Sequence, residues 1–237
     1  MEAVDQDSIE LRITSAGAKG SKLRAGKGIN LPDAVLDIDL LGSHSRDALQ
    51  FAAGHADIVE LSFVSRAHEV ERVNRYLDQH SRPEVGMILK IETRRAFEHL
   101  PGMLLAAVGG ERPAGVMIAR GDLAVECGYE RLAEVQEEIL WLCQAAHVPV
   151  IWATQVLDQL AKTGRPSRAE ITDAAMGVQA GCVMLNKGPR IIEAISVLDD
   201  ILRRMERHHR KKRSLLPRLQ ASDYVRTDRG TETLTIS

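Results

Sequence analysis

Five short runs of almost continuously apolar residues, separated by helix-like stretches, constrain the fold of this chain more than any other feature. A strand that lacks polar alternation is typical of a parallel sheet whose two faces are both covered. Strands that alternate with helices of this length predict βαβ units, and therefore an α/β fold with a parallel sheet. The five runs are ADIVELSFV (56–64), VGMILKIE (85–92), AGVMIARGD (114–122), VPVIWATQ (148–155) and AGCVMLNKG (180–188).

The stretches between these runs carry the signals of helices. Ser167 and Glu170 have the S-x-x-E spacing of a capping box, which predicts that a helix begins here. The predicted helices include HEVERVNRYLDQH (68–80), ERLAEVQEEILWLCQAAH (130–147) and RAEITDAAMGVQA (168–180). A last helix is predicted from an apolar stripe with helical spacing, which we expect to pack on the core. The stripe consists of Ile191, Ile195, Leu198, Leu202 and Met205.

The two ends of the chain differ from its centre. Residues 1–30 contain a strand-like segment, SIELRITSAG, and the start of a glycine-rich connector. Residues 31–205 hold the alternating pattern, which makes this range the main domain. Residues 206–237 begin with the basic run ERHHRKKRS and continue as a polar tail. We interpret this tail as a solvated helix end followed by disorder, with contact to RNA or phosphate as the alternative.

Composition excludes several classes of function. The formal net charge of -2 gives no overall field that would attract nucleic acid or an anionic membrane. The 3 cysteines are odd in number and widely spaced, which fits a reducing cytosol better than a disulfide framework or a zinc site. No apolar run approaches the roughly 18 residues of a membrane span, and the acidic N-terminus does not resemble a signal peptide. We therefore expect a cytoplasmic protein, in which the tripeptide Arg120-Gly121-Asp122 is not an adhesion motif.

Polar residues stand where the predicted strands end, at the edge where parallel α/β folds bind ligands. Glu92 and Asp122 come from neighbouring strands and could share a hard cation such as magnesium. Lys90 could neutralise a phosphoryl or enolate oxygen, and Gly121 would let the backbone approach a ligand. Residues two apart share a strand face, so Lys90–Glu92 and Arg120–Asp122 are alternatively structural ion pairs.

These residues resemble motifs of the pyruvate kinase family. GSKLRAGKGINLP (20–32) resembles the return from that family's small cap domain into its barrel. ADIVELSFV and MILKIE are similar to the fourth and fifth barrel strands, MIARGDLAVE to the sixth, and VIWATQVLDQL with GRPSRAEITDAA to the seventh and its helix. The resemblance implies a partial TIM (β/α)8 barrel of strands four to eight, with residues 1–30 as a remnant of the cap domain and its connector.

The resemblance also implies roles for individual residues. Lys90 would stabilise the phosphoryl group during transfer, and Thr154 would help to deliver a proton to the enolate carbon. Glu92 and Asp122 would bind Mg²⁺ or Mn²⁺. The residues expected at the substrate are Ser62, Lys90, Gly121, Asp122 and Thr154. The implied reaction transfers phosphate from phosphoenolpyruvate to ADP, giving pyruvate and ATP in glycolysis.

The chain departs from the family pattern in two respects. After the eighth strand the family usually has a Ser-Gly-Glu-Thr loop, whereas this chain has MLNKGPR (184–190), so the nucleotide contacts of Asn186 and Lys187 stay open. The resemblance places three further strands, with a phosphate-binding arginine and the potassium ligands, before this sequence, and a regulatory domain after it. We expect a homo-oligomer or a further barrel segment to complete such a sheet, whose edges would otherwise be open.

Three hypotheses follow from the resemblance and the departures. The first is a pyruvate-kinase-like phosphotransferase that depends on magnesium and potassium. The second is a magnesium-dependent lyase or aldolase that stabilises an enolate of pyruvate or oxaloacetate without a nucleotide. The third is an inactive module that requires a partner.

Overall fold

A computed structural model describes residues 2–5, 7–16, 18, 20, 22, 25, 29–32, 34, 39–80, 84–110 and 112–210. The contacts within the chain divide it into two units, Met1–Leu31 and Pro32–Ser237. Much of the connector at 20–32 and all of the tail at 211–237 lie outside the described residues. Among the described residues, no helix is both long enough and apolar enough to cross a membrane.

The N-terminal unit contains a short antiparallel pair of strands. β1 (Ala3–Val4) pairs with β2 (Ile9–Glu10), and an ion pair of 2.7 Å joins Arg12 Nε to Glu2 Oε1. Of the residues of the strand-like segment SIELRITSAG that the structure describes, only Ile9–Glu10 lies in a ladder. The side chains of both strands are exposed, so this hairpin buries little apolar surface within its own unit.

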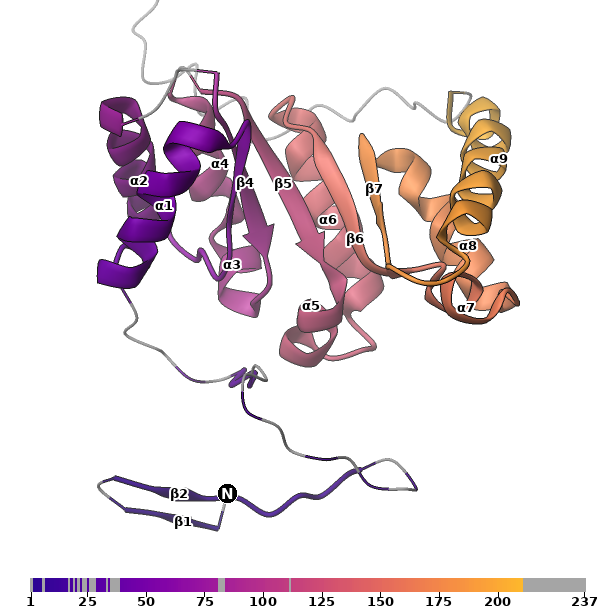
Figure 1. Cartoon of the computed structure of the whole chain (residues 1–237), viewed down its shortest axis with the longest axis horizontal. Helices are drawn as coiled ribbons and strands as arrows, with labels where there is room; N and C mark the ends of the chain where they lie inside the picture. The colour runs from indigo at the N-terminus through magenta and orange to yellow at the C-terminus, as the bar shows by residue number, and fades with distance from the viewer. Residues whose placement is uncertain are drawn as a thin grey trace, which may run out of the picture. The chain divides into compact units, whose positions relative to one another are not determined.

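Five parallel strands form the sheet of the second unit, in the same order as in the chain (Figure 1). Each strand pairs with the next through a parallel register, and a helical segment connects each pair, as in a (β/α)8 barrel. The strands are β3 (Ile58–Leu61), β4 (Gly86–Ile91), β5 (Ala114–Ala119), β6 (Val150–Val156) and β7 (Cys182–Leu185). This arrangement confirms the α/β fold and the part of the barrel that the sequence predicts.

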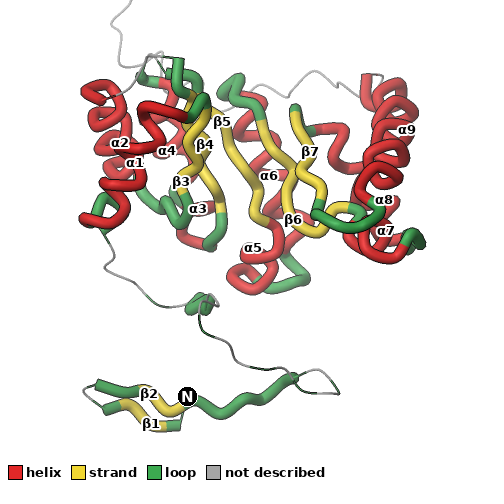
Figure 2. Tube along the Cα trace, in the orientation of Figure 1, coloured by secondary structure: helices red, strands yellow, loops and turns green. Residues whose placement is uncertain are grey.

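Helices cover one side of this sheet and gather at its two ends (Figure 2). α1, α2 and α4 lie near β3 and β4, α6 lies behind β5 and β6, and α8 and α9 lie beside β7. Their bounds are α1 (Ser43–His55), α2 (Ala67–His80), α3 (Arg94–Glu98), α4 (Leu100–Val108), α5 (Arg120–Cys127), α6 (Leu132–Ala145), α7 (Asp158–Thr163), α8 (Arg168–Met176), the 3₁₀ turn η1 (Gly177–Gln179) and α9 (Ile191–Arg210).

The predicted capping box at the start of α8 is present. The Ser167 hydroxyl accepts a hydrogen bond of 3.2 Å from the Glu170 amide, and the Glu170 carboxylate accepts one of 2.9 Å from the Ser167 amide. Two amide groups that the first turn would leave unsatisfied are thereby paired. The local sequence alone fixes this helix start.

The core lies between the sheet and its helices. On β4 the side chains of Leu89 and Ile91 join the main cluster, whereas Ile88 belongs to a small cluster with Met117 and Ala153. Successive residues of a strand point to opposite faces, so the small cluster marks the face away from the helices. Both faces of the sheet are apolar, as the unbroken strand runs predict.

The apolar stripe predicted for α9 packs on the core only in part. Ala194 and Leu198 are buried, but Ile195 is 49% exposed, so its expected place in the core is wrong. The buried line runs through Ala194 and Leu198, one helical turn apart, and Ile195 lies about 100° around the axis from Ala194. α9 also continues past residue 205 as far as Arg210.

Replacing Leu89 by alanine should lower the free energy of unfolding by about 2–5 kcal/mol, because its side chain is fully buried in the main cluster. Leu105 of α4 provides a matched control, since its side chain is 73% exposed. Leu105→Ala should change the free energy of unfolding by less than about 0.5 kcal/mol. Urea denaturation followed by circular dichroism measures both values, and equal losses would contradict the placement of the core.

Replacing Gly188 by alanine should destabilise the contact between the loop after β7 and α7. An added Cβ would lie 2.3 Å from the carbonyl oxygen of Ala161 and 2.6 Å from its carbon, and these backbone atoms cannot rotate away. We expect a loss of about 1–3 kcal/mol in the free energy of unfolding.

Gly54 of α1 is the control for this substitution, because a Cβ there would meet no atom within 4 Å. Gly54→Ala should raise the free energy of unfolding by about 0.5–1 kcal/mol, since alanine is the better helix former. The midpoint temperatures of thermal unfolding of the two variants should therefore shift in opposite directions from that of the unmodified chain. A Gly188→Ala variant as stable as the unmodified chain would show that the loop lies elsewhere.

Candidate active site

Ser62, Lys90 and Glu92 meet at the carboxyl ends of β3 and β4. Lys90 Nζ donates a hydrogen bond of 2.9 Å to Ser62 Oγ and lies 3.0 Å from Glu92 Oε1. The Lys90 side chain is 21% exposed and that of Glu92 is 5% exposed, so the ammonium group reaches solvent while the carboxylate is buried. The sequence predicts that Lys90 and Glu92 lie on the same side of the strand. Their side chains form an ion pair, and Ser62 of the neighbouring segment accepts a hydrogen bond from the same lysine.

Backbone geometry just after β3 directs an amide at the same carboxylate. Phe63 has a left-handed conformation with φ of 56°, and its N–H donates a hydrogen bond of 2.6 Å to Glu92 Oε2. The left-handed region costs a non-glycine residue of the order of 1 kcal/mol, which a hydrogen bond to a buried carboxylate can offset. Glu92 is thus held on one oxygen by Lys90 and on the other by Phe63.

The expected continuation of the third run as a strand through Asp122 is wrong. β5 ends at Ala119, and Arg120 begins α5. Residues two apart on a helix point in different directions, so Arg120 and Asp122 do not share a face. Asp122 lies instead in the first turn of α5, half-buried, where the helix dipole favours a carboxylate.

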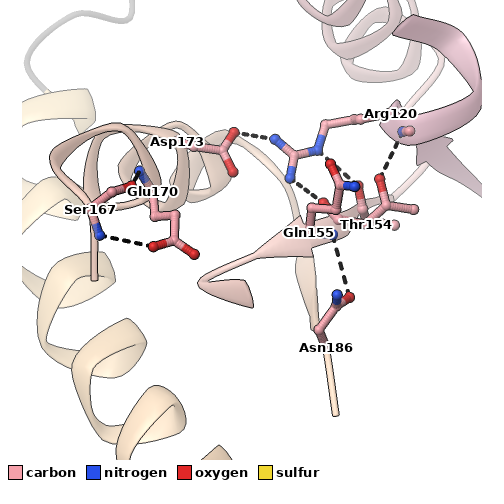
Figure 3. Close-up of polar contacts among 9 residues, drawn as sticks. Arg120, Thr154, Gln155, Ser167, Glu170, Asp173 and Asn186 are labelled. Carbon is pink, nitrogen blue, oxygen red and sulfur yellow. Dashed lines mark hydrogen bonds and ion pairs between the residues drawn. The ribbon is translucent and has the colours of Figure 1, made fainter. Parts of the chain in front are cut away.

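Arg120 has its ion pair with Asp173 of α8, whereas the sequence suggested a pair with Asp122 (Figure 3). Its Nε donates a hydrogen bond of 2.8 Å to the carbonyl of Ala153, and one Nη donates to the carbonyl of Thr154. The guanidinium carbon also lies 4.6 Å from the ring centroid of Trp152, in a cation–π contact. Sequence reasoning missed this role, because no local pattern relates Asp173 to the end of β5.

A hydrogen bond joins Gly121, in the first turn of α5, to Thr154 of β6. The Gly121 amide donates a hydrogen bond of 2.9 Å to Thr154 Oγ1. A Cβ added at Gly121 would lie 3.5 Å from Thr154 Oγ1, an ordinary contact distance, so packing within the described chain does not require glycine here. Because the Thr154 oxygen accepts this bond, its own hydrogen stays available to another acceptor.

The end of β6 is irregular where it presents Thr154. Thr154 and Gln155 both have left-handed backbones, with φ of 68° and 57°, and the pairing with β7 shifts between Trp152 and Val156. Such a bulge re-aims side chains at the rim of a sheet. The amide of Gln155 donates a hydrogen bond of 3.4 Å to Asn186 Oδ1 (Figure 3).

Asn186, in the loop that departs from the family pattern, is engaged within the protein. Its amide nitrogen donates to the carboxylate of Asp158, and its oxygen accepts from Gln155. The hydrogen bond from Lys162, followed by that from Asn186, lowers the pKa of Asp158. Lys187 is exposed beside it.

The parallel registers bring the two groups of residues to one edge of the sheet. Ile91 pairs with Ile118 and Ala119 with Ala153, so Glu92 and Arg120 directly follow the ends of β4 and β5, and Thr154 lies in the last residues of the neighbouring β6. The structure therefore joins Ser62 with Lys90 and Glu92, and Gly121 with Thr154. Asp122 lies at the same edge, on the first turn of α5.

The carboxylates at this edge have the chemistry of magnesium ligands. Among the described residues, no group of three acidic, histidine or cysteine side chains gathers into a metal site. Magnesium needs few protein ligands, since it retains several waters and often uses one or two carboxylates with substrate oxygens. Glu92 accepts one bond on each oxygen, which leaves other lone pairs of the carboxylate to a cation. Glu92 and Asp122 therefore fit such a donor set.

Comparison with known proteins assigns a family to this arrangement. The family described as "Pyruvate kinase, barrel domain" matches residues 1–189. A pyruvate kinase of Agrobacterium vitis is 34% identical over 204 residues, which cover 83% of this chain and 40% of that protein. One of Bacillus licheniformis is 30% identical over 237 residues, 96% of this chain and 39% of that protein. One of Hypocrea jecorina is 33% identical over 185 residues, 77% of this chain and 32% of that protein.

The chain thus spans well under half the length of these relatives, between 32% and 40%. The matched region contains all five strands of the parallel sheet and every predicted site residue. The chain belongs to the pyruvate kinase family.

Proposed function

We propose that this chain carries the phosphoenolpyruvate and magnesium portion of a pyruvate kinase site, which transfers phosphate from phosphoenolpyruvate to ADP. One observation carries the proposal, namely the contact of Lys90 with both Ser62 and Glu92 at the carboxyl edge of the sheet. That edge is where parallel α/β folds bind their ligands. The family relationship supplies the substrate class.

Lys90 is suited to stabilise the phosphoryl group during transfer. An ammonium group has three N–H donors, and the bonds to Ser62 and Glu92 use two of them. The third stays available to a phosphoryl oxygen, on the partly exposed side of the group. Phosphoryl transfer demands positioning and charge neutralisation rather than covalent work by the protein, which is the role that a fixed cation can perform.

Glu92 and Asp122 are the residues that would hold magnesium. When bound, the ion would neutralise the negative charge on phosphoryl and enolate oxygens. Glu92 suits this role because Lys90 and the Phe63 amide already fix its orientation. Asp122 suits it because the first turn of α5 presents it at the end of the neighbouring strand.

Thr154 is suited to pass a proton to the enolate carbon, directly or through water. The bond from the Gly121 amide occupies a lone pair of the hydroxyl oxygen, so the hydroxyl hydrogen can point away from the protein. General acid catalysis requires a donor in such a fixed position. The bulge at Thr154 and Gln155 supports this assignment, because strained backbone of this kind gathers at functional sites.

The open sheet supports a need for further barrel strands, from a second copy or from another segment. Within the described residues, β3 and β7 each pair on one side only. Ile58 of β3 is 59% exposed, and Cys182 of β7 is exposed as well. Unpaired strand edges favour association. An isolated chain that folds but shows no turnover would support the hypothesis of a module that requires a partner.

A second candidate function is favoured by the contacts of Asn186. Its side-chain amide is committed to Gln155 and Asp158, in the loop that replaces the Ser-Gly-Glu-Thr sequence usual in the family. A magnesium-dependent lyase or aldolase would use Lys90, Glu92 and Asp122 without any nucleotide. Decarboxylation of oxaloacetate that does not depend on ADP would favour this candidate over the kinase.

Replacing Lys90 by methionine should abolish pyruvate formation from phosphoenolpyruvate and ADP, because the cation at the phosphoryl group is lost. Removing one such charge costs roughly a hundredfold or more in turnover. Turnover is measured with magnesium and potassium present, and binding of Mn²⁺ should survive the substitution. Unchanged turnover in the variant would refute the role of Lys90.

Lys162 gives a matched control for this variant. It is also an ion-paired lysine, 2.8 Å from Asp158, but its side chain is 59% exposed on α7. Lys162→Met should leave turnover within about twofold, since an exposed i,i+4 pair contributes only about 0.3–0.5 kcal/mol. A loss of turnover equal to that of Lys90→Met would indicate a general effect of removing lysines.

Replacing Glu92 by glutamine should weaken binding of Mn²⁺ by roughly ten- to hundredfold, because a charged oxygen ligand is lost. Electron paramagnetic resonance of the free ion measures this affinity without any turnover. Glu126 is the control, since it is equally buried on α5 but has no assigned role at the site. Equal affinity in Glu92→Gln and the unmodified chain would exclude Glu92 as a ligand.

A further inference from the structure

The backbone that presents Thr154 is strained and must be held by its surroundings. Thr154 and Gln155 are consecutive left-handed residues, and Leu157 follows with φ of 48°. Each such non-glycine residue costs of the order of 1–2 kcal/mol. The strand would relax to a regular extended form unless contacts elsewhere fixed these peptide groups.

Arg120 makes contacts of this kind. Its guanidinium donates to the carbonyls of Ala153 and Thr154, which flank the first left-handed residue. The planar guanidinium presents its donors in a rigid fork, so binding two successive carbonyls fixes the directions of both peptide planes. The side chain is only 8% exposed, which leaves little water to compete for these bonds.

Asp173 and Trp152 fix the guanidinium in turn. Asp173 of α8 forms an ion pair with one Nη of Arg120, and the ring of Trp152 lies 4.6 Å from the guanidinium carbon. A buried arginine that lost its carboxylate would carry an uncompensated charge, so its geometry depends on that partner. Figure 3 shows Asp173 and Thr154 on opposite sides of the Arg120 head group.

The residue after Arg120 binds the side chain of the same threonine. The Gly121 amide donates to Thr154 Oγ1 at 2.9 Å. The turn from β5 into α5 therefore holds Thr154 twice, through its carbonyl by the Arg120 side chain and through its hydroxyl by the Gly121 amide. Any movement of the Thr154 peptide would lengthen this second bond.

We propose that Arg120, oriented by Asp173, is a positioning residue that fixes the direction of the Thr154 hydroxyl. Neither residue needs to touch the substrate for this role. The effect of Arg120 and Asp173 on catalysis rests on the proposed function of Thr154, whereas their effect on the position of its hydroxyl does not. The two parts can therefore be tested separately.

A second arginine–aspartate pair, at the opposite edge of the sheet, serves as the control. Arg112 is also buried, donates a hydrogen bond of 2.7 Å to the carbonyl of Val85, and lies 2.9 Å from Asp78. It precedes β5, at the amino edge of the sheet, whereas Arg120 follows β5 at the carboxyl edge. Asp78→Asn therefore removes the same kind of partner far from the site.

The first experiment measures hydrogen exchange of the Gly121 amide by NMR in the full chain. In Asp173→Asn we expect this amide to exchange roughly tenfold faster or more, because its bond to Thr154 Oγ1 is no longer held. Amides within β4 should keep their rates, and Asp78→Asn should leave Gly121 unchanged. The proposal that Asp173 and Arg120 position Thr154 would be overturned if the Gly121 amide exchanged at an unchanged rate in Asp173→Asn. It would also be overturned if Asp78→Asn accelerated this exchange equally.

The second experiment measures exchange of the pyruvate methyl hydrogens with solvent deuterium, in the presence of magnesium and potassium. In each event a C–H bond breaks to give the enolate and its proton passes to solvent water, and a C–D bond then forms with a deuteron from solvent. Asp173→Asn should lower the rate at saturating pyruvate by roughly tenfold, while KM stays within about twofold, since the substrate contacts remain. An unchanged exchange rate would refute a role of Arg120 and Asp173 in proton transfer.

The outcomes of the two experiments are distinct. If the unmodified chain exchanges no pyruvate hydrogens, the proposed function fails, but the Gly121 amide still decides whether Asp173 and Arg120 position Thr154. As a further variant, Arg120→Lys retains the charge but loses the fork, so Gly121 should exchange faster than in the unmodified chain. A Gly121 rate in Arg120→Lys equal to that of the unmodified chain would count against the proposal.

Discussion

Parallel pairing of successive strands is the constraint on which every feature of this site depends. Because β3 to β7 run the same way and pair in chain order, their carboxyl ends lie along one edge. Residues far apart in the sequence thus become neighbours, as Ser62 and Lys90 do at 2.9 Å. An antiparallel sheet would send the ends of β4 and β5 to opposite edges and separate Glu92 from Arg120.

The face of the sheet on which Lys90 lies determines how far the ion pair with Glu92 is exposed to solvent. The opposite face is covered by helices and filled with apolar side chains, whereas Lys90 and Glu92 follow Ile88 on the face that these helices leave uncovered. A buried ion pair contributes little to stability on balance, because desolvation offsets the attraction between the charges. Lys90 avoids part of that desolvation cost because its side chain is partly exposed, which is consistent with the ligand-binding role proposed for the pair.

The sequence predicts the part of the site that depends on strand periodicity, and it fails where the backbone leaves the strand. Lys90 is in the regular strand β4 and Glu92 directly follows its end, two residues further on, so the strand pattern predicts that their side chains lie on the same side. The run through Asp122 reads as one strand, but the chain turns at Ala119, and the apolar residues Leu123 and Ala124 belong to a helix. Asp173 could not be found from the sequence, because it reaches Arg120 only through the packing of α8 beside β6.

The strands determine one part of this site, and the surrounding elements determine the rest. Strand order and register bring Lys90, Glu92 and Thr154 to one edge, but the direction of the Thr154 hydroxyl depends on a bulge that a regular ladder would not contain. That bulge is held by Arg120 at the start of α5, and by Asn186 from the loop after β7. Under the proposed function, a change in either neighbour would alter the position of Thr154 while Lys90 and Glu92 stay in place.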